Sequence, residues 1–79
     1  MNAWQEIRRV VSTDGKRRMT VKLTPNSLFR FFEDTLAYDD DNDITYWSPS
    51  HMSGLYASAD DAERAAYSEL PWLRDRNSN

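Results

Sequence analysis

The most chemically suggestive segment of the chain is an acidic run, DDDND, near its middle. Its alternate carboxylates, Asp39, Asp41 and Asp43, match the first three ligand positions of a calcium-binding EF-hand loop. Such a loop also needs glycine at its sixth position and glutamate at its twelfth, where this chain has Ile44 and Ser50. Because both diagnostic residues are missing, the sequence predicts no metal site. We interpret the run as a solvated turn or a protein-recognition loop.

The single histidine, His51, follows Ser50, and this pairing raises the question of nucleophilic catalysis. A Ser-His pair needs the imidazole to face the hydroxyl, but adjacent residues of a strand point to opposite faces. The chain also lacks a G-x-S-x-G nucleophile elbow, and its two glycines, Gly15 and Gly54, are too far apart to form a phosphate-binding loop. The sequence therefore predicts no catalytic residue and no cofactor.

The composition describes one small domain without covalent staples. The 79 residues include no cysteine, which removes disulfides, thiolate nucleophiles and Cys-ligated zinc. Aromatic residues make up 13% of the chain, so large rings are available for a core. No apolar stretch has the length of a signal peptide or a membrane span. We therefore expect a cytoplasmic protein with no membrane partner and no small-molecule ligand.

Charge is divided unevenly along the chain. Residues 1–30 carry seven Lys or Arg and two acids, a net charge of +5, whereas residues 31–79 carry three Arg and eleven acids, a net charge of −8. This asymmetry predicts a basic face and an acidic face, either of which can attract a partner. The alternative is that the two halves pair with each other across the fold.

Residues 4–23 read as a β-hairpin, because apolar and polar residues alternate in its second arm. A three-residue turn at residues 13–15 would place Ile7 opposite Val21 and Glu6 opposite Lys22. A two-residue turn would instead mix the two faces, so we prefer the longer one. The preferred register gathers on the buried face Ile7, Val11, Met19, Val21 and Leu23. It leaves on the other face Arg8, Arg18, Thr20 and Lys22.

The middle of the chain predicts two further strands. Residues 24–27 form a turn, and the apolar spacing of residues 28–38 fits either a helix or a strand. The many aromatic residues of this segment favour the strand. Residues 44–47 predict a fourth strand, and Pro49 makes the stretch beyond it an edge or a bulge.

The C-terminal part predicts one helix over residues 59–70. Ser58 followed by Asp61 is an aspartate version of the capping box, and alanines form a narrow apolar stripe. Pro71 ends the helix, and Trp72 folds back with the next residue onto the core. Residues 74–79 are expected to be a disordered tail.

These elements predict an α+β domain over residues 1–73. A small antiparallel sheet, the N-terminal hairpin plus one or two further strands, would pack on a single C-terminal helix. One helix covers one side of a sheet, so we expect some rings to be exposed or buried against another molecule.

Residues 53–67 (SGLYASADDAERAAY) resemble in architecture the strand-to-helix junction of AP2-type and integrase arm-type DNA-binding domains. Those domains place a three-stranded sheet, backed by a helix, in the major groove, so the resemblance implies nucleic-acid binding through the hairpin. The basic residues that would contact phosphates are Arg8, Lys16, Arg17, Arg18 and Lys22.

Protein binding accounts for more of the sequence and is the first expectation. Aromatic residues are enriched at the centres of protein interfaces. Protein binding therefore explains why this chain has more aromatic residues than one side of a sheet can bury against a helix. The predicted contact residues are Trp4, Phe29, Phe31, Tyr46, Trp47 and Tyr56, together with the acidic Asp39, Asp41 and Asp43. Self-association through an edge or the open face is the simplest form, and a short, acidic inhibitor or accessory protein of a phage or mobile element fits this description.

Overall fold

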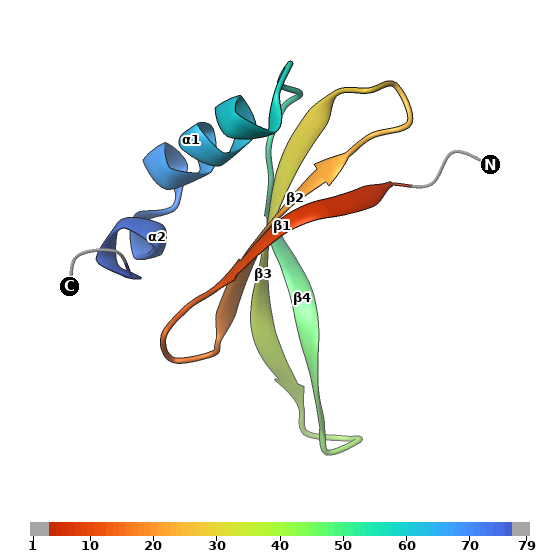
Figure 1. Cartoon of the computed structure of the whole chain (residues 1–79). Helices are drawn as coiled ribbons and strands as arrows, with labels where there is room; N and C mark the ends of the chain where they lie inside the picture. The colour runs from red at the N-terminus through yellow and green to blue at the C-terminus, as the bar shows by residue number, and fades with distance from the viewer. Residues whose placement is uncertain (1–3, 77–79) are drawn as a thin grey trace.

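The computed structural model describes residues 4–76, which form an antiparallel sheet followed by two helices (Figure 1). The sheet has four strands in the order β1-β2-β3-β4. The strands are β1 (Gln5–Val11), β2 (Arg17–Leu23), β3 (Phe29–Asp39) and β4 (Ile44–Met52), and the helices are α1 (Ala59–Glu69) and α2 (Pro71–Arg76). The predicted α+β class with an antiparallel sheet is therefore confirmed.

The turn between β1 and β2 is longer than the predicted one. Val11 lies opposite Arg18, and the Ser12 backbone N–H donates to the Arg17 carbonyl, which leaves residues 13–16 as the loop. The Ser12 hydroxyl accepts the backbone N–H groups of Lys16 and Arg17, and it donates to Asp14. This hydroxyl closes the wider loop, and Gly15 adopts a φ of 74° within it.

The register of the hairpin corrects the predicted faces of β1. Near the turn Arg8 lies opposite Val21, and a bulge at Ile7 then restores the predicted pairing of Glu6 with Lys22. Ile7 and Val11 are therefore 39% and 37% exposed and are absent from the buried core. Arg8 lies on the same face as α1, because its guanidinium donates to acidic residues of that helix.

Residues 29–38 belong to a strand, as predicted, since β3 pairs with β2 along one edge and with β4 along the other; Leu28 lies just before this strand. β4 runs through Pro49 at the edge of the sheet, and the ladder shifts register between Glu33 and Asp34. Pro49 is tolerated there because an edge strand does not need every backbone donor. Beyond β4, Tyr56 forms an isolated bridge with Phe29 and leads the chain to α1.

The helical part begins as predicted and continues further. The Ser58 hydroxyl caps α1 by accepting the backbone N–H of Asp61. Pro71 ends α1 but also starts α2, where a residue without an N–H fits the first helical position. The prediction of a single helix is wrong in this respect. Of the predicted disordered tail, residues 74–76 belong to α2 and residues 77–79 lie outside the described residues.

The core lies between the sheet and the two helices. Its fully buried strand residues are Met19, Val21 and Phe31, which face two small side chains of α1, Ala62 and Ala66. Alanines let the helix approach the sheet closely, so that the core remains thin. From the C-terminal end the core is completed by Leu70 and Leu73.

Candidate interaction surface

The helices cover one side of the sheet and leave the other side open. Because residues paired across antiparallel strands share a face, the register assigns the open face directly. Its members on β1 and β2 are Glu6, Arg9, Val11, Arg18, Thr20 and Lys22, of which Thr20 is only 3% exposed. From β3 and β4 it presents Arg30, Phe32, Asp34, Leu36, Tyr38, Thr45, Trp47, Pro49 and Met52. We call this surface the open face.

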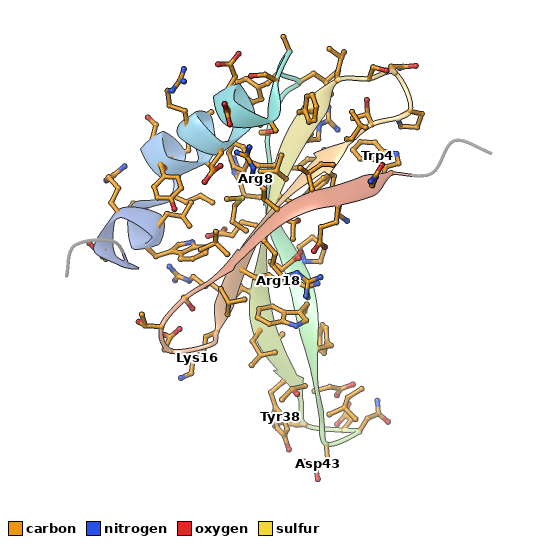
Figure 2. The ribbon with its side chains drawn as sticks, in the orientation of Figure 1. Trp4, Arg8, Lys16, Arg18, Tyr38 and Asp43 are labelled. Atoms are coloured by element: carbon orange, nitrogen blue, oxygen red, sulfur yellow. The ribbon has the colours of Figure 1, made fainter. Side chains whose placement is uncertain are left out.

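An ion pair over an indole ring occupies the middle of the open face. The Arg18 guanidinium donates to Asp34 at 2.9 Å, and its central carbon lies 4.5 Å from the centre of a Trp47 ring. The two charged side chains are only 24% and 16% exposed. Figure 2 shows Arg18 directed away from the helices, whereas Arg8 is directed toward α1. Arg18 is therefore held by two contacts in one orientation.

Two more cations lie over aromatic rings at the end of the open face where β3 begins. The Lys22 ammonium lies 5.1 Å from the Phe32 ring, and the Arg30 guanidinium lies 5.9 Å from that of Trp4. Trp4 also contacts Phe32 edge to face. We call Lys22 and Arg30 the basic end.

Arg30 is incompletely satisfied within this arrangement. Its guanidinium donates to the sulfur of Met52 at 3.3 Å, and its Nε is buried without a hydrogen-bond partner. A thioether is a weak acceptor. The basic end thus presents a cation that no carboxylate among residues 4–76 neutralises.

A shallow groove runs over the open face between its aromatic and charged side chains. It has a volume of about 600 Å³ and is lined in part by Arg18, Phe32, Trp47, Pro49 and Met52. Met52 is 57% exposed at its margin. Rings, a fixed guanidinium and a thioether in one groove are typical of a protein-binding surface.

The opposite end of the face is a two-stranded extension. Residues 37–46, which we call the arm, pair only within β3 and β4, since the pairing with β2 stops at Thr35. Figure 1 shows the arm projecting away from the helices. Its large side chains are exposed: Tyr38 by 55%, Ile44 by 52% and Tyr46 by 48%.

The turn of the arm carries the acidic run. The Asn42 amide donates to Asp39, and this hydrogen bond lowers the pKa of the Asp39 carboxyl. The Tyr38 hydroxyl donates to Asp43, which raises the pKa of Tyr38. Figure 2 shows Tyr38 and Asp43 at the same tip. Side-chain hydrogen bonds thus order a turn whose charges are all negative.

The predicted protein-binding residues divide between this surface and the core. Trp4, Trp47 and the three aspartates lie on the open face or the arm, and Tyr46 is exposed on the other side of the arm. Phe31 is wrong as a contact residue because it is fully buried. Phe29 and Tyr56 also pack against the core.

The predicted nucleic-acid residues are not brought together. Arg18 and Lys22 share the open face, whereas Arg8 binds Asp60 at 2.9 Å and also binds Glu63. Hydrogen bonding to Asp60 raises the pKa of Arg8.

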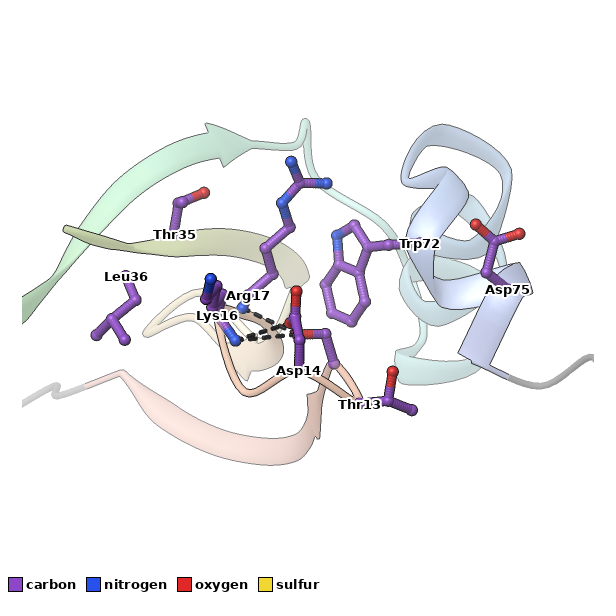
Figure 3. A pocket seen from close by; sticks show the side chains of 9 residues that line it. Thr13, Asp14, Lys16, Arg17, Thr35, Leu36, Trp72 and Asp75 are labelled. Carbon is purple, nitrogen blue, oxygen red and sulfur yellow. Dashed lines mark hydrogen bonds between the residues drawn. The ribbon is translucent and has the colours of Figure 1, made fainter.

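Lys16 and Arg17 instead line a separate pocket of about 360 Å³ near α2 (Figure 3). Trp72 and Asp75 line it from α2, and Asp14 lines it from the loop between β1 and β2. Hydrogen bonding from Ser12 lowers the pKa of Asp14. The prediction that Arg8 shares a face with Arg18 and Lys22 is thus wrong, because Arg8 faces α1.

Among the open-face residues that sequence reasoning missed are Arg9, Arg30 and Phe32. Arg9 binds Glu6 at 2.9 Å beside the central pair. A strand at residues 28–38 implies that Phe31 and Phe32 point to opposite faces of the sheet. Only the pairing with β2 shows that Phe31 is the one that faces the helix.

Ser50 and His51 form hydrogen bonds with other residues and not with each other. His51 Nε2 donates to Glu69 Oε1, 3.1 Å away, and the imidazole stacks on Phe31. Ser50 instead forms hydrogen bonds with Thr35 and Glu33, which lie on the same side of the sheet as His51. Within the described chain, no group of three or more His, Cys, Asp or Glu side chains could hold a metal ion.

Comparisons with family models, curated proteins and solved structures yield no match to this chain. Neither helix within residues 4–76 is long and apolar enough to cross a membrane.

Proposed function

We propose that the protein is a non-enzymatic binding module that contacts another protein through its open face. The observation that carries this proposal is the set of three rings on the uncovered side of the sheet, each with a cationic side chain over it. Tryptophan and arginine are the residues that most often dominate binding energy at protein interfaces. Their concentration on a face without a covering element favours a partner there.

The state of the central pair favours a protein over a nucleic acid. Arg18 is already bound to Asp34 and lies over Trp47, so neither its charge nor the ring is free for a phosphate or a base. Glu6 adds a second carboxylate to the same face, and the acidic arm would repel a polyanion. An ion pair that is already fixed over a ring costs little to order on binding, and it matches a protein surface that has apolar and polar groups side by side.

Site-specific photo-crosslinking tests the proposal in cells that naturally contain the protein. A photoreactive phenylalanine analogue would replace Met52, which is exposed at the groove, and in a matched protein it would replace Arg64 of α1. We expect a protein adduct from position 52 that is lost when Trp47→Ala is added. Equal adducts from both positions, or none from position 52, would contradict the proposal.

Nucleic-acid binding is a second candidate because Lys22 and Arg30 share one face with the rings and no carboxylate within residues 4–76 forms an ion pair with either. Titration of single-stranded and duplex oligonucleotides at two salt concentrations tests it. Binding that weakens steeply with salt, and that Lys22→Gln reduces, would support this candidate. Nucleic acid crosslinked from position 52 would favour it over protein binding.

A further inference from the structure

The open face has opposite charges at its two ends. The basic end is formed by Lys22 and Arg30, and the arm at the other end carries four aspartates within residues 39–43. β3 spans both ends, and Asp34 is the middle residue of its eleven. Arg30 lies as far before Asp34 as Tyr38 lies after it.

This arrangement is complementary to itself. We propose that the open face binds the open face of a second copy of this chain, related by a twofold axis near Asp34 and perpendicular to the strands. This inference rests on the proposed function and names its partner. The rotation lays the acidic arm of each copy over the basic end of the other, so that the same contact is made twice.

In the dimer, the basic end gains a hydrogen-bond acceptor and the arm gains a cover for its exposed ring. The Arg30 guanidinium, which has only a thioether acceptor among the described residues, comes opposite the Tyr38–Asp43 pair of the second copy. The exposed Tyr38 ring is covered in the same contact. Near the axis, each Arg18 stays paired with the Asp34 carboxylate of its own copy, so the two chains meet there through ion pairs that are already neutralised.

The size of the face is close to what a small dimer interface needs. Its strands of 7, 7, 11 and 9 residues, at about 3.4 Å per residue and about 4.8 Å apart, give a face of about 550 Å². Specific protein interfaces begin at about 600 Å² on each partner. Two twisted sheets also pack face to face in many sandwiches, at an angle near 30°.

A charge-exchange experiment tests the proposed geometry. One variant, Lys22→Glu with Arg30→Glu, reverses the basic end, and the other, Asp40→Lys with Asp41→Lys, reverses two exposed residues of the arm. Sedimentation equilibrium should show a wild-type dimer and, for each variant alone, a dissociation constant raised at least about tenfold by like charges. An equimolar mixture of the two variants should restore the dimer, because every contact then again joins opposite charges.

The control is Arg64→Glu on α1, whose side chain is 77% exposed, and it should dimerise like the wild type. Circular dichroism establishes that each variant is folded; if the basic-end variant is not, the arm variant alone still tests the contact. A monomeric wild type at all concentrations, or a dimer that neither variant weakens, overturns the inference. If the position-52 crosslink then captures a different protein, the proposed function stands; if it captures none, both fail.

Discussion

At the scale of single residues, the Arg18–Asp34 pair is the best organised contact of the open face. Its side chains are less exposed than those of the Arg64–Asp61 pair on α1, which are 77% and 48% exposed. Water screens the second pair far more strongly than the first. The two pairs therefore offer a direct comparison within one molecule.

We expect Arg18→Ala to lower the free energy of unfolding by about 1–3 kcal/mol, because it removes a charged hydrogen bond and leaves Asp34 partly buried without its cation. Arg64→Ala should lower it by less than about 0.5 kcal/mol. Urea unfolding at one fixed protein concentration measures both. Equal losses would show that the central pair contributes no more than a surface pair.

At the scale of elements, α1 depends on its cap. Ser58→Ala removes the acceptor for the Asp61 backbone N–H, and we expect it to lower the free energy of unfolding by about 1 kcal/mol. Ser58→Asp should retain most of the stability, since a carboxylate also caps this position. Thermal or urea unfolding of the two variants checks the expectation, and an Asp variant as weak as the Ala variant would contradict it.

The arm turn gives a pH-dependent prediction. The pKa of Asp39 is lowered mainly by the Asn42 amide, so its contribution to stability is present above the ordinary value of 3.8 and is lost as the pH falls through the lower folded pKa. Asn42→Ala should raise the pKa of Asp39 toward that value and reduce the stability lost below it. Carboxyl titration by NMR measures the shift, with Asn26→Ala as the control. An unchanged Asp39 titration would refute this account.

Most elements could be predicted from local sequence, and their relative placement could not. Alternation around Met19 and the cap at Ser58 are properties of adjacent residues, and both predictions are confirmed. The bulge at Ile7 depends on which face of β1 meets α1, and Arg8 finds its acidic partners 52 and 55 residues further along the chain. Such long-range contacts leave no local pattern.

The surface was predicted less completely than the fold for the same reason. One helix can cover only one side of a sheet, so the uncovered face could be predicted. Which of Phe31 and Phe32 lies on that face depends on the register with β2. Neither Arg30 nor the opposite charges of the two ends of β3 stands out until the strands are paired.

At the scale of the whole molecule, the core is small enough that α2 should be necessary for it. Leu73 is fully buried although it lies in the short final helix. We expect Leu73→Ala to lower the free energy of unfolding by about 2–5 kcal/mol, as for other buried leucines. Leu55→Ala, at a position 50% exposed, is the matched control and should have a much smaller effect. If Leu73→Ala lowered the free energy of unfolding as little as Leu55→Ala does, the core would not depend on α2.

The contacts of Arg8 with Asp60 and Glu63 also bear on biosynthesis. β1 leaves the ribosome before α1 has been made, so the strand remains without its ionic partners during most of translation. A nascent chain interrupted before α1 would display Met19, Val21 and Phe31 to the surrounding solution. Quality-control factors that recognise apolar strands would therefore distinguish incomplete chains from finished ones at this surface.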